Sequence, residues 1–441
     1  MAKDKKINLL FDATIIVNAY DKKQSNRSGI FFVALNVLRQ LSHCKDITIY
    51  LYSQNLNLER CWNKIKKQYF QDQNSKRILP HIPGIKEKIN YKIIKNREKL
   101  KYFCKKNKIL RCTWLKMKIA LDNFLYQLLK VIIKEDAYSN VDVFLSPVFP
   151  VPDVIHNNKK IKKYIFLYDL IPYIFSDKYK EHLKPTTWFS KLLGSLSNDE
   201  IYFAISECTK RDFLKYFPKL KEENIVVTLL GYNENFYKAD AQSQSMVRQK
   251  YGIPLNGKYV FSLCNIEERK NLIREIKTFA DFINKNHIDD MYFVLGGAKV
   301  QSFIEIFEKS IDSLDFVKNR IIRAGYIDDE DLAPLYSGAE WFVYTSQYEG
   351  FGLPPLEAMA CGCPVITSNS SSLPEVVGDA GIMIDWDSDE QHIQAYEKYY
   401  FDKEFRNSMA EKGIERASQF SWTKCADIMI NKMKRDCEND R

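Results

Sequence analysis

The sequence predicts an α/β protein with two doubly wound domains, each a parallel sheet covered by helices on both faces. Short apolar runs, typical of buried strands, alternate with stretches of helical periodicity along both halves of the chain. The 441 residues are too many for one ordinary core and fit two domains of roughly 200 residues each. Hydrophobic residues make up 45% of the chain, enough to bury two cores, which excludes a mainly disordered protein.

In the first half, residues 7–17 read as a buried strand, and 29–41 follow with apolar residues at helical spacing. Polar residues dominate 232–245, which is typical of a linker between domains. We therefore predict a first domain over 1–235, interrupted by a basic insert at about 54–140. Its further strands are expected at 47–52, 141–145, 163–170, 201–205 and 225–230.

The second half, predicted as a domain over 246–420, repeats the alternation more regularly. One helix, for example, is expected over 271–283. Ligands of such parallel sheets bind at the carboxyl ends of the strands. We therefore expect a site in a cleft where the two domains face each other. The strands are expected at 259–263, 292–295, 321–324, 341–345, 364–367 and 382–384.

Composition points to the cytoplasm. The ten cysteines are scattered, with no Cys-x-x-Cys and no Cys/His cluster at zinc spacing, which favours reduced thiols and no structural metal. Four of the first six residues are charged, and the apolar run after them is broken by Asp12, so no signal peptide is expected. No apolar stretch of about 18 residues occurs, and we expect a soluble or peripheral protein.

Positive charge is concentrated in one segment. Residues 86–134 carry 15 lysines and arginines against three acids, an excess that is larger than the +10 of the whole chain. Aromatic residues alternate with the lysines in 101–106 and again in 114–118. This mixture suits an anionic membrane surface, where rings enter the headgroup layer and ammonium groups meet the lipid charge. A solvated lysine-rich helix and a nucleic-acid surface are the alternatives, and we expect no nucleic-acid partner.

The most informative stretch, 346–366, reads SQYEGFGLPPLEAMACGCPVI. It predicts a strand end, a glycine-containing loop and a helix start. Gly350 and Gly352 let backbone approach a ligand, and the free N–H groups of the helix start favour a diphosphate. Glu349 and Glu357 suit sugar hydroxyls as hydrogen-bond acceptors and would be poor ligands for the phosphates themselves.

This stretch resembles the Glu-x7-Glu signature of glycosyltransferase family 4, within EGFGLPPLEAMACGCPVI. The resemblance implies that Glu349 contacts hydroxyls of the donor sugar and that Glu357 holds the nucleotide ribose. The residues between them that we expect to bind the donor are Gly350, Phe351, Gly352 and Leu353.

A second motif, SLCNIEERKNL over 262–272, follows the first predicted strand of the second domain. It resembles the G-x-x-x-x-R-K-N loop of the same family, whose basic residues bind the leaving diphosphate. Arg269 and Lys270 are the matching residues, and we expect both to act in catalysis. Two positions depart from the pattern, because Cys264 stands where Gly or Arg is usual and Glu268 replaces a common Pro.

Further segments of the second half match the family less specifically. Gly296 ends a strand and would let backbone line the nucleotide site. Tyr326 and Ile327 lie in a segment whose backbone reads the base in the family. The sequence Phe420-Ser-Trp resembles the start of the last helix, which in such proteins crosses back to the first domain, so 421–441 is predicted as a crossover helix and tail.

The first domain matches the family in fewer places. Gly29, in SGIFF, resembles the glycine loop that approaches the donor phosphates, although the usual second glycine is missing. Tyr168-Asp-Leu-Ile-Pro resembles the H-D-x-x-P strand end, with Tyr168 in place of the histidine. Asp169 is expected either to orient the donor sugar or acceptor hydroxyl, or to cap a turn. Ser206 matches a position that faces the site.

The resemblance implies a GT-B fold of two Rossmann-like domains and a retaining glycosyltransferase. It also implies a nucleotide-sugar donor, no metal or other cofactor, and a saccharide or lipid-linked acceptor. The segments look most like mannosyl- and rhamnosyltransferases of bacterial surface polysaccharides, and such an enzyme is expected at the inner face of the cell membrane. An epimerase or phosphorylase acting on nucleotide sugars and a transferase with a protein acceptor are the alternatives. An NAD dehydrogenase is poorly supported, because no Gly-x-Gly-x-x-Gly follows a first strand.

Overall fold

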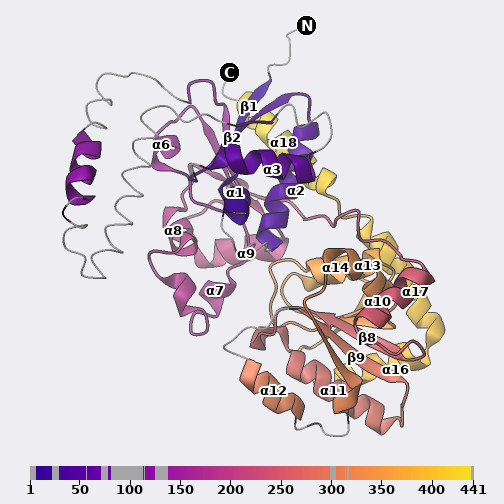
Figure 1. The fold of residues 1–441 in the computed structure, drawn as a ribbon. Coiled ribbons are helices and arrows are strands. Elements are labelled where there is room, and N and C mark those ends of the chain that lie inside the picture. Colours follow the sequence, from indigo (N-terminus) through magenta and orange to yellow (C-terminus); the bar gives the residue numbers. More distant parts are fainter. Residues whose placement is uncertain are drawn as a thin grey trace. The chain divides into compact units, whose positions relative to one another are not determined.

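A computed structural model describes residues 6–21, 29–55, 57–70, 78–80, 113, 115–124, 138–297, 304–312, 314 and 317–438. Their strands form two parallel sheets with helices between successive strands (Figure 1). The predicted α/β fold with two doubly wound sheets is therefore confirmed. Of the predicted basic segment 86–134, only residue 113 and a helical stretch at 115–124 are described, and the rest lies outside the described residues.

The first sheet has seven strands in the order β3-β2-β1-β4-β5-β6-β7. Its interior strand β1 is buried on both faces, as a parallel strand covered by helices on two sides requires. Leu9 of β1 pairs with Ile49 on one side and with Val143 on the other. The strands are β1 (Ile7–Asp12), β2 (Ile47–Tyr52), β3 (Ile78–Pro80), β4 (Val143–Ser146), β5 (Lys162–Leu167), β6 (Ile201–Ala204) and β7 (Ile225–Val227).

The strand predicted over 7–17 ends earlier, at Asp12. The Asp12 carboxylate accepts a hydrogen bond from the Thr14 backbone N–H at 2.9 Å, which turns the chain into a helix at Thr14. The apolar residues after this turn continue the strand's hydrophobic run, so the pattern alone did not mark the boundary. The helices around this sheet are α1 (Thr14–Asp21), α2 (Gly29–His43), α3 (Leu58–Tyr69), α6 (Asp153–His156), α7 (Ile171–Ile174), α8 (Trp188–Ser195) and α9 (Glu207–Tyr216).

The second sheet has six strands in the order β10-β9-β8-β11-β12-β13. The order reverses between β8 and β11, which pair directly through Phe261 and Phe342. Parallel α/β sheets bind ligands at such a switch point, beyond the carboxyl ends of the strands. The strands are β8 (Lys258–Leu263), β9 (Met291–Gly296), β10 (Ile321–Gly325), β11 (Trp341–Tyr344), β12 (Val365–Ser368) and β13 (Gly381–Ile384).

Helices cover both faces of the second sheet. Figure 1 shows α11, α12 and α16 on one side, where Val260 and Trp341 join the buried core. The rings of Phe261, Tyr336 and Phe342 pack edge to face in the other layer. The helices are α10 (Ala241–Lys250), α11 (Leu272–Lys285), α12 (Ile304–Asp312), α13 (Asp329–Ser337), α14 (Leu353–Ala360), α15 (Leu373–Val377), α16 (Asp389–Phe401), α17 (Lys403–Ala417) and α18 (Trp422–Glu438).

Contacts along the chain divide it into two compact units. The first holds Met1–Phe166, Lys191–Ile201 and Ile430–Arg441, and the second holds Leu167–Ser190 and Tyr202–Met429. The last helix begins in the second unit and ends in the first, where Lys434 Nζ lies 2.6 Å from Asp46 Oδ2. Its course agrees with the predicted crossover helix. The predicted domain boundaries at 235 and 246 stay a prediction.

Candidate functional site

The carboxyl ends of β8 and β11 carry the most specific sequence motifs. Arg269 and Lys270 follow β8 in a short 3-10 turn, and Glu349 follows β11 in the glycine-containing loop. Because β8 and β11 are parallel neighbours, the two loops emerge at the same edge of the sheet. The Gln347 N–H donates to the Arg269 carbonyl at 2.9 Å, which ties the loops together.

Arg269 and Lys270 both bind one carboxylate oxygen. Glu349 Oε1 accepts a hydrogen bond from Arg269 Nη1 at 2.8 Å and another from Lys270 Nζ at 2.7 Å. Lys270 Nζ also donates to the Tyr344 hydroxyl at 2.6 Å, and Arg269 Nη1 donates to the Tyr348 carbonyl. Arg269 and Glu349 are each only 8% exposed, so these charges interact with little screening by water.

The charges of this cluster fix its ionisation. Burial alone would raise the pKa of Glu349, but the charges of Lys270 and Arg269 lower that pKa to about 2. The carboxylate is therefore ionised at neutral pH, and the three side chains together carry one net positive charge. The Nε of Arg269 is also buried and has no hydrogen-bond partner in the described part of the chain. A cluster of this kind can accept a further anionic group.

Asp169 lies against the loop that carries Glu349. A Cβ added to Gly350 would lie 2.8 Å from the Asp169 Cβ, so only glycine allows this approach. The Gly350 carbonyl accepts hydrogen bonds from the Ser206 hydroxyl at 2.8 Å and from the Thr209 hydroxyl at 3.3 Å. Burial raises the pKa of Asp169, and the Arg269 charge offsets part of that rise. The structure thus brings Asp169 and Ser206 to the predicted signature loop.

The loop ends in a helix start suited to an anion. Gly352 precedes α14 with a φ of 127°, a backbone conformation that favours glycine, and Leu353 is the first helical residue. Pro354 and Pro355 follow and carry no N–H, so the donors at this helix end come from the residues before them. Phe351 is buried and packs edge to face on Phe420, and this contact anchors the loop to the residues just before α18.

Glu357 lies on the same helix, about one turn further along. The Tyr336 hydroxyl of α13 donates to its Oε2 at 3.4 Å, a long hydrogen bond. Burial raises the pKa of Glu357 to about 8, because this single contact replaces little of the lost hydration. The carboxyl of Glu357 is therefore mostly protonated at neutral pH, in contrast to Glu349.

Replacing Glu357 with glutamine should flatten the pH dependence of stability. The folded-state pKa of Glu357 lies above its ordinary value of 4.5, so its contribution is fully present below pH 4.5 and is lost as pH rises to about 8. Between pH 5 and pH 9 the wild type should lose on the order of 4 kcal/mol more stability than Glu357→Gln. Urea unfolding at both pH values measures this, and equal losses would contradict the assignment.

The remaining predicted donor-binding residues are placed as follows. A Cβ on Gly296, at the end of β9, would lie 2.3 Å from Ile327 Cδ1. Glycine therefore lets the Ile327 side chain, which follows β10, approach the end of β9. Ile327 is buried, whereas Tyr326 is 75% exposed. Gly29 is the first residue of α2, in the first unit, and a Cβ there would meet nothing within 4 Å. The donor-binding roles of these residues stay a prediction.

Sequence reasoning missed several side chains of this site. Tyr344 ends β11 in an apolar run that predicts only a buried strand, yet its hydroxyl accepts a hydrogen bond from Lys270. Tyr179 donates to Glu267 at 2.9 Å, and Glu267 Oε2 lies 3.7 Å from Arg269 Nη2. Tyr179 precedes Glu267 by 88 residues, and nothing in either segment signals the contact.

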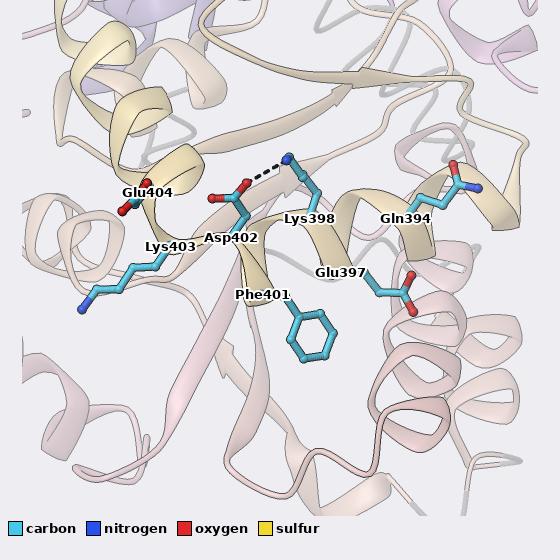
Figure 2. Close-up of a pocket in the computed structure, with 7 residues that line it drawn as sticks. All are labelled: Gln394, Glu397, Lys398, Phe401, Asp402, Lys403 and Glu404. Atoms are coloured by element: carbon cyan, nitrogen blue, oxygen red, sulfur yellow. Dashed lines mark hydrogen bonds and ion pairs between the residues drawn. The ribbon is translucent and has the colours of Figure 1, made fainter.

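Elsewhere on the second unit, the ends of α16 and α17 form a surface hollow (Figure 2). Its charged side chains are partly neutralised, since Lys398 Nζ lies 2.7 Å from Asp402 Oδ2. None of the predicted site residues contributes to it. Across the residues that the structure describes, no group of three or more His, Cys, Asp or Glu side chains is placed to hold a metal ion. The hollow is lined by Gln394, Glu397, Lys398, Phe401, Asp402, Lys403 and Glu404.

Two Rossmann-like parallel sheets, with the cluster at the switch point of the second, define the GT-B class of fold. The structure superposes on the crystal structure of Anabaena HepE in complex with UDP and glucose with a TM-score of 0.63. That match covers 97% of this chain and 100% of the other at 14% identity, a level that shows the fold alone. The predicted GT-B fold is therefore confirmed.

The second sheet and its helices resemble a known family. Residues 243–416 match the family model "Glycosyl transferases group 1". The chain is 32% identical over 243 residues to O-antigen chain mannosyltransferase B of Escherichia coli, covering 54% of this chain and 62% of that protein. It is 27% identical over 266 residues to the serotype-specific mannosyltransferase WbdA of Escherichia coli, covering 60% of this chain and 32% of that protein. The chain thus spans less than two thirds of these curated relatives.

Proposed function

We propose that the chain is a retaining glycosyltransferase that moves a hexosyl residue, with mannose as the first candidate, from a nucleotide-sugar donor to a saccharide or lipid-linked acceptor in surface polysaccharide synthesis. The observation that carries this proposal is the pair of cations, the buried Arg269 and the partly buried Lys270, on one oxygen of Glu349 at the switch point of the sheet. The stretch that matches the group 1 family model contains all three residues. Two relatives named as mannosyltransferases favour the sugar.

The cluster suits a nucleoside diphosphate as leaving group. Arg269 and Lys270 would donate to the diphosphate oxygens as the bond to the sugar breaks and charge grows there. The diphosphate would take over part of the hydrogen bonding that Glu349 now receives. Glu349 Oε1 could then accept hydrogen bonds from hydroxyls of the transferred sugar, beside the breaking bond. Glu357, further along α14, would accept from the ribose.

Retention follows if the acceptor attacks from the side that the diphosphate leaves. The bond between the anomeric carbon and the phosphate oxygen breaks, and the acceptor oxygen forms the new bond on the same face. The acceptor's proton passes to the departing phosphate oxygen, so no separate side-chain base is required. Asp169, against the Gly350 backbone, would orient an acceptor or donor hydroxyl.

The test is donor-dependent nucleotide release with a panel of nucleotide sugars, led by mannosyl and rhamnosyl donors. We expect release of the nucleoside diphosphate, stimulated by a saccharide or lipid-linked acceptor, and an α-linked product from an α-linked donor. An epimerase would instead change the sugar and leave it attached to the nucleotide. Inverted product stereochemistry would overturn the retaining mechanism, and no release with any donor would overturn the proposal.

Turnover should survive an excess of chelator. Arg269 and Lys270 are fixed cations at the place where a divalent ion would otherwise neutralise the diphosphate. We expect less than a twofold change, on the order of the assay's scatter, when EDTA is added to the nucleotide-release assay. Loss of activity in EDTA that magnesium or manganese restores would show that the reaction needs a metal.

We further propose that the basic segment 86–134 binds an anionic membrane surface at the inner face of the cell membrane. In the described helical stretch 115–124, the exposed apolar side chains of Met117, Leu121 and Phe124 follow one another at helical spacing on one face. Lys116 and Lys118 are exposed beside them. No helix within the described ranges is long and apolar enough to cross a membrane.

Liposome co-sedimentation should show binding to anionic vesicles and little binding to neutral ones. Each lysine near an anionic surface contributes about 1 kcal/mol at best, so binding should be reversible and weaken with salt. Changing the lysines of 99–118 to glutamine should abolish it, and Leu121→Asp with Phe124→Asp, in a chain that keeps its lysines, should weaken it. Equal binding to neutral and anionic vesicles, or binding unchanged by the lysine substitutions, would contradict the proposal.

A further inference from the structure

A buried carboxyl group lies on α11, five residues after Lys270. Glu275 is fully buried, and both of its oxygens accept hydrogen bonds from uncharged groups. Oε1 accepts from the Thr345 backbone N–H at 2.7 Å and from the Thr345 hydroxyl at 2.9 Å. Oε2 accepts from the Ser262 hydroxyl at 3.0 Å. One side chain thus joins α11 to the ends of β8 and β11.

His392 of α16 contacts the same hydroxyl from the other side. Its ring is fully buried, with Nδ1 2.7 Å from the Ser388 carbonyl and Nε2 3.1 Å from Thr345 Oγ1. A carbonyl can only accept, so Nδ1 carries a proton. In a neutral imidazole, Nε2 is then an acceptor that faces the Thr345 hydroxyl.

The hydrogen count favours one extra proton on this chain of groups. The Thr345 hydroxyl has one hydrogen, yet it lies between two potential acceptors, Glu275 Oε1 and His392 Nε2. If both were deprotonated, one of these two buried acceptors would face a lone pair of the hydroxyl oxygen, which is unfavourable away from water. One added proton removes the conflict in either of two ways. It resides on Nε2, with the Thr345 hydroxyl turned to Glu275, or on Oε2. In the second case Ser262 accepts from Oε2 instead of donating to it, its own hydrogen turns away, and the Thr345 hydroxyl is free to donate to Nε2.

This network lies directly under the candidate site. Thr345 follows Tyr344, whose hydroxyl binds Lys270, and it begins the loop to Glu349. Asn271, next to Lys270, has its Nδ2 3.3 Å from Thr345 Oγ1. A shift of Thr345 would therefore move both the carboxylate and the ammonium group of the cluster.

We propose that Glu275 and His392 share one proton through the Thr345 hydroxyl, and that this network positions Glu349 and Lys270. Glu275, Thr345 and His392 are positioning residues, since none of them touches the Glu349 cluster directly. The positioning part of this inference rests on the proposed function, whereas the sharing of the proton does not.

The charged groups around the network set the pH at which its proton is lost. Burial raises the pKa of Glu275 to about 7, while hydrogen bonds from Thr345 and Ser262 and the charge of Lys270 offset part of the rise. Burial lowers the pKa of His392, as does Arg274, and Asp389 opposes this. The folded protein thus holds a proton that the Glu275 carboxyl of the unfolded chain would release near pH 4.5. The stabilisation that this proton contributes is therefore fully present below pH 4.5 and is lost as pH rises through about 7.

Nitrogen NMR of histidine-labelled protein tests the shared proton without any activity assay. The chain has six histidines, and a His392→Asn variant assigns the signal. In the wild type, the His392 ring nitrogens should show a titration step near pH 7 that reports Glu275. Glu275→Gln keeps the shape and mimics the protonated acid, so this step should vanish. Identical His392 titrations in the wild type and Glu275→Gln would overturn the sharing. If Glu275→Gln does not fold, Thr345→Val replaces it, with the same expected loss and the same refuting result.

A matched pair at Thr345 tests the positioning. Thr345→Val keeps the shape and the backbone N–H but removes the hydroxyl, and Thr345→Ser restores it. We expect Thr345→Val to lower turnover about tenfold or more with little change in the donor KM, and Thr345→Ser to recover most of that loss. Wild-type turnover in Thr345→Val, measured below its unfolding midpoint, would overturn the positioning role. Absence of turnover in the wild type would overturn the proposed function instead, and the NMR result would stand.

Discussion

Replacing Lys270 with methionine should lower turnover by about 100-fold or more, the loss expected when one preorganised donor to a transition-state charge is removed. Methionine keeps the length of the side chain and its packing near Tyr344, so the ammonium group is the main loss. The charge on a departing diphosphate is greatest in the transition state, so kcat should fall more than donor affinity. Arg269→Met should have a similar effect, because Arg269 contacts the same carboxylate oxygen.

Folding must be separated from catalysis in this variant. Without Lys270, Glu349 keeps only Arg269 as a charged partner, and its depressed pKa should rise. Thermal unfolding of Lys270→Met reports whether the fold is kept. The double variant Lys270→Met with Glu349→Gln, which also removes the buried Glu349 charge, is measured in the same way. Lys398→Met in the surface hollow of Figure 2 is the matched control and should keep full turnover. Full turnover in Lys270→Met would remove this residue from the mechanism.

The strands of both sheets could be predicted because they are short apolar runs bounded by polar residues. In the second sheet the expected 259–263 became Lys258–Leu263, and 341–345 became Trp341–Tyr344. Prediction was weaker where a single side chain ends an element. Asp12 turned the first strand into a helix within an apolar run. The edge strand Ile78–Pro80 has three residues, too few for a pattern to be detected.

The central cluster could also be predicted, at the level of residues. Glu349, Arg269 and Lys270 stood out because they occupy specific motifs after the first and fourth strands of the second domain. The bonding among them could not be predicted, since it depends on the side-by-side pairing of β8 and β11, whose motifs are about 80 residues apart.

The position of Glu275 in the sequence predicts a buried carboxyl group. It lies three residues after Leu272 and four before Phe279, both on the buried face of α11. A carboxylate at a core position of an amphipathic helix requires hydrogen-bond partners. Its partners, Ser262 and Thr345, come from two strands that the sequence does not show to be neighbours.

Glu349 and Glu357 are one signature in the sequence but differ in the structure. Glu349 is ionised by two cations, with a pKa of about 2, whereas burial raises the pKa of Glu357 to about 8. This difference agrees with separate roles. The ionised carboxylate lies among the groups assigned to the breaking bond. Among the described residues, the hydrogen bond found for the second carboxyl is the one from Tyr336.

Glu349→Gln should therefore lower turnover by about 100-fold or more while leaving the donor KM within a few-fold of the wild type. The amide keeps the shape but removes the charge that orients Arg269 and Lys270 and that would accept from the transferred sugar. Glu357→Ala should show the opposite pattern, a higher donor KM with a smaller change in kcat, because its assigned partner, the ribose, does not change during the reaction. Steady-state kinetics with varied donor, supported by calorimetric binding of the nucleoside diphosphate, distinguishes the two. Wild-type turnover in Glu349→Gln would show that Glu349 takes no part in the reaction. Equal effects of both variants on KM would show that the two carboxylates do not bind different parts of the donor as proposed.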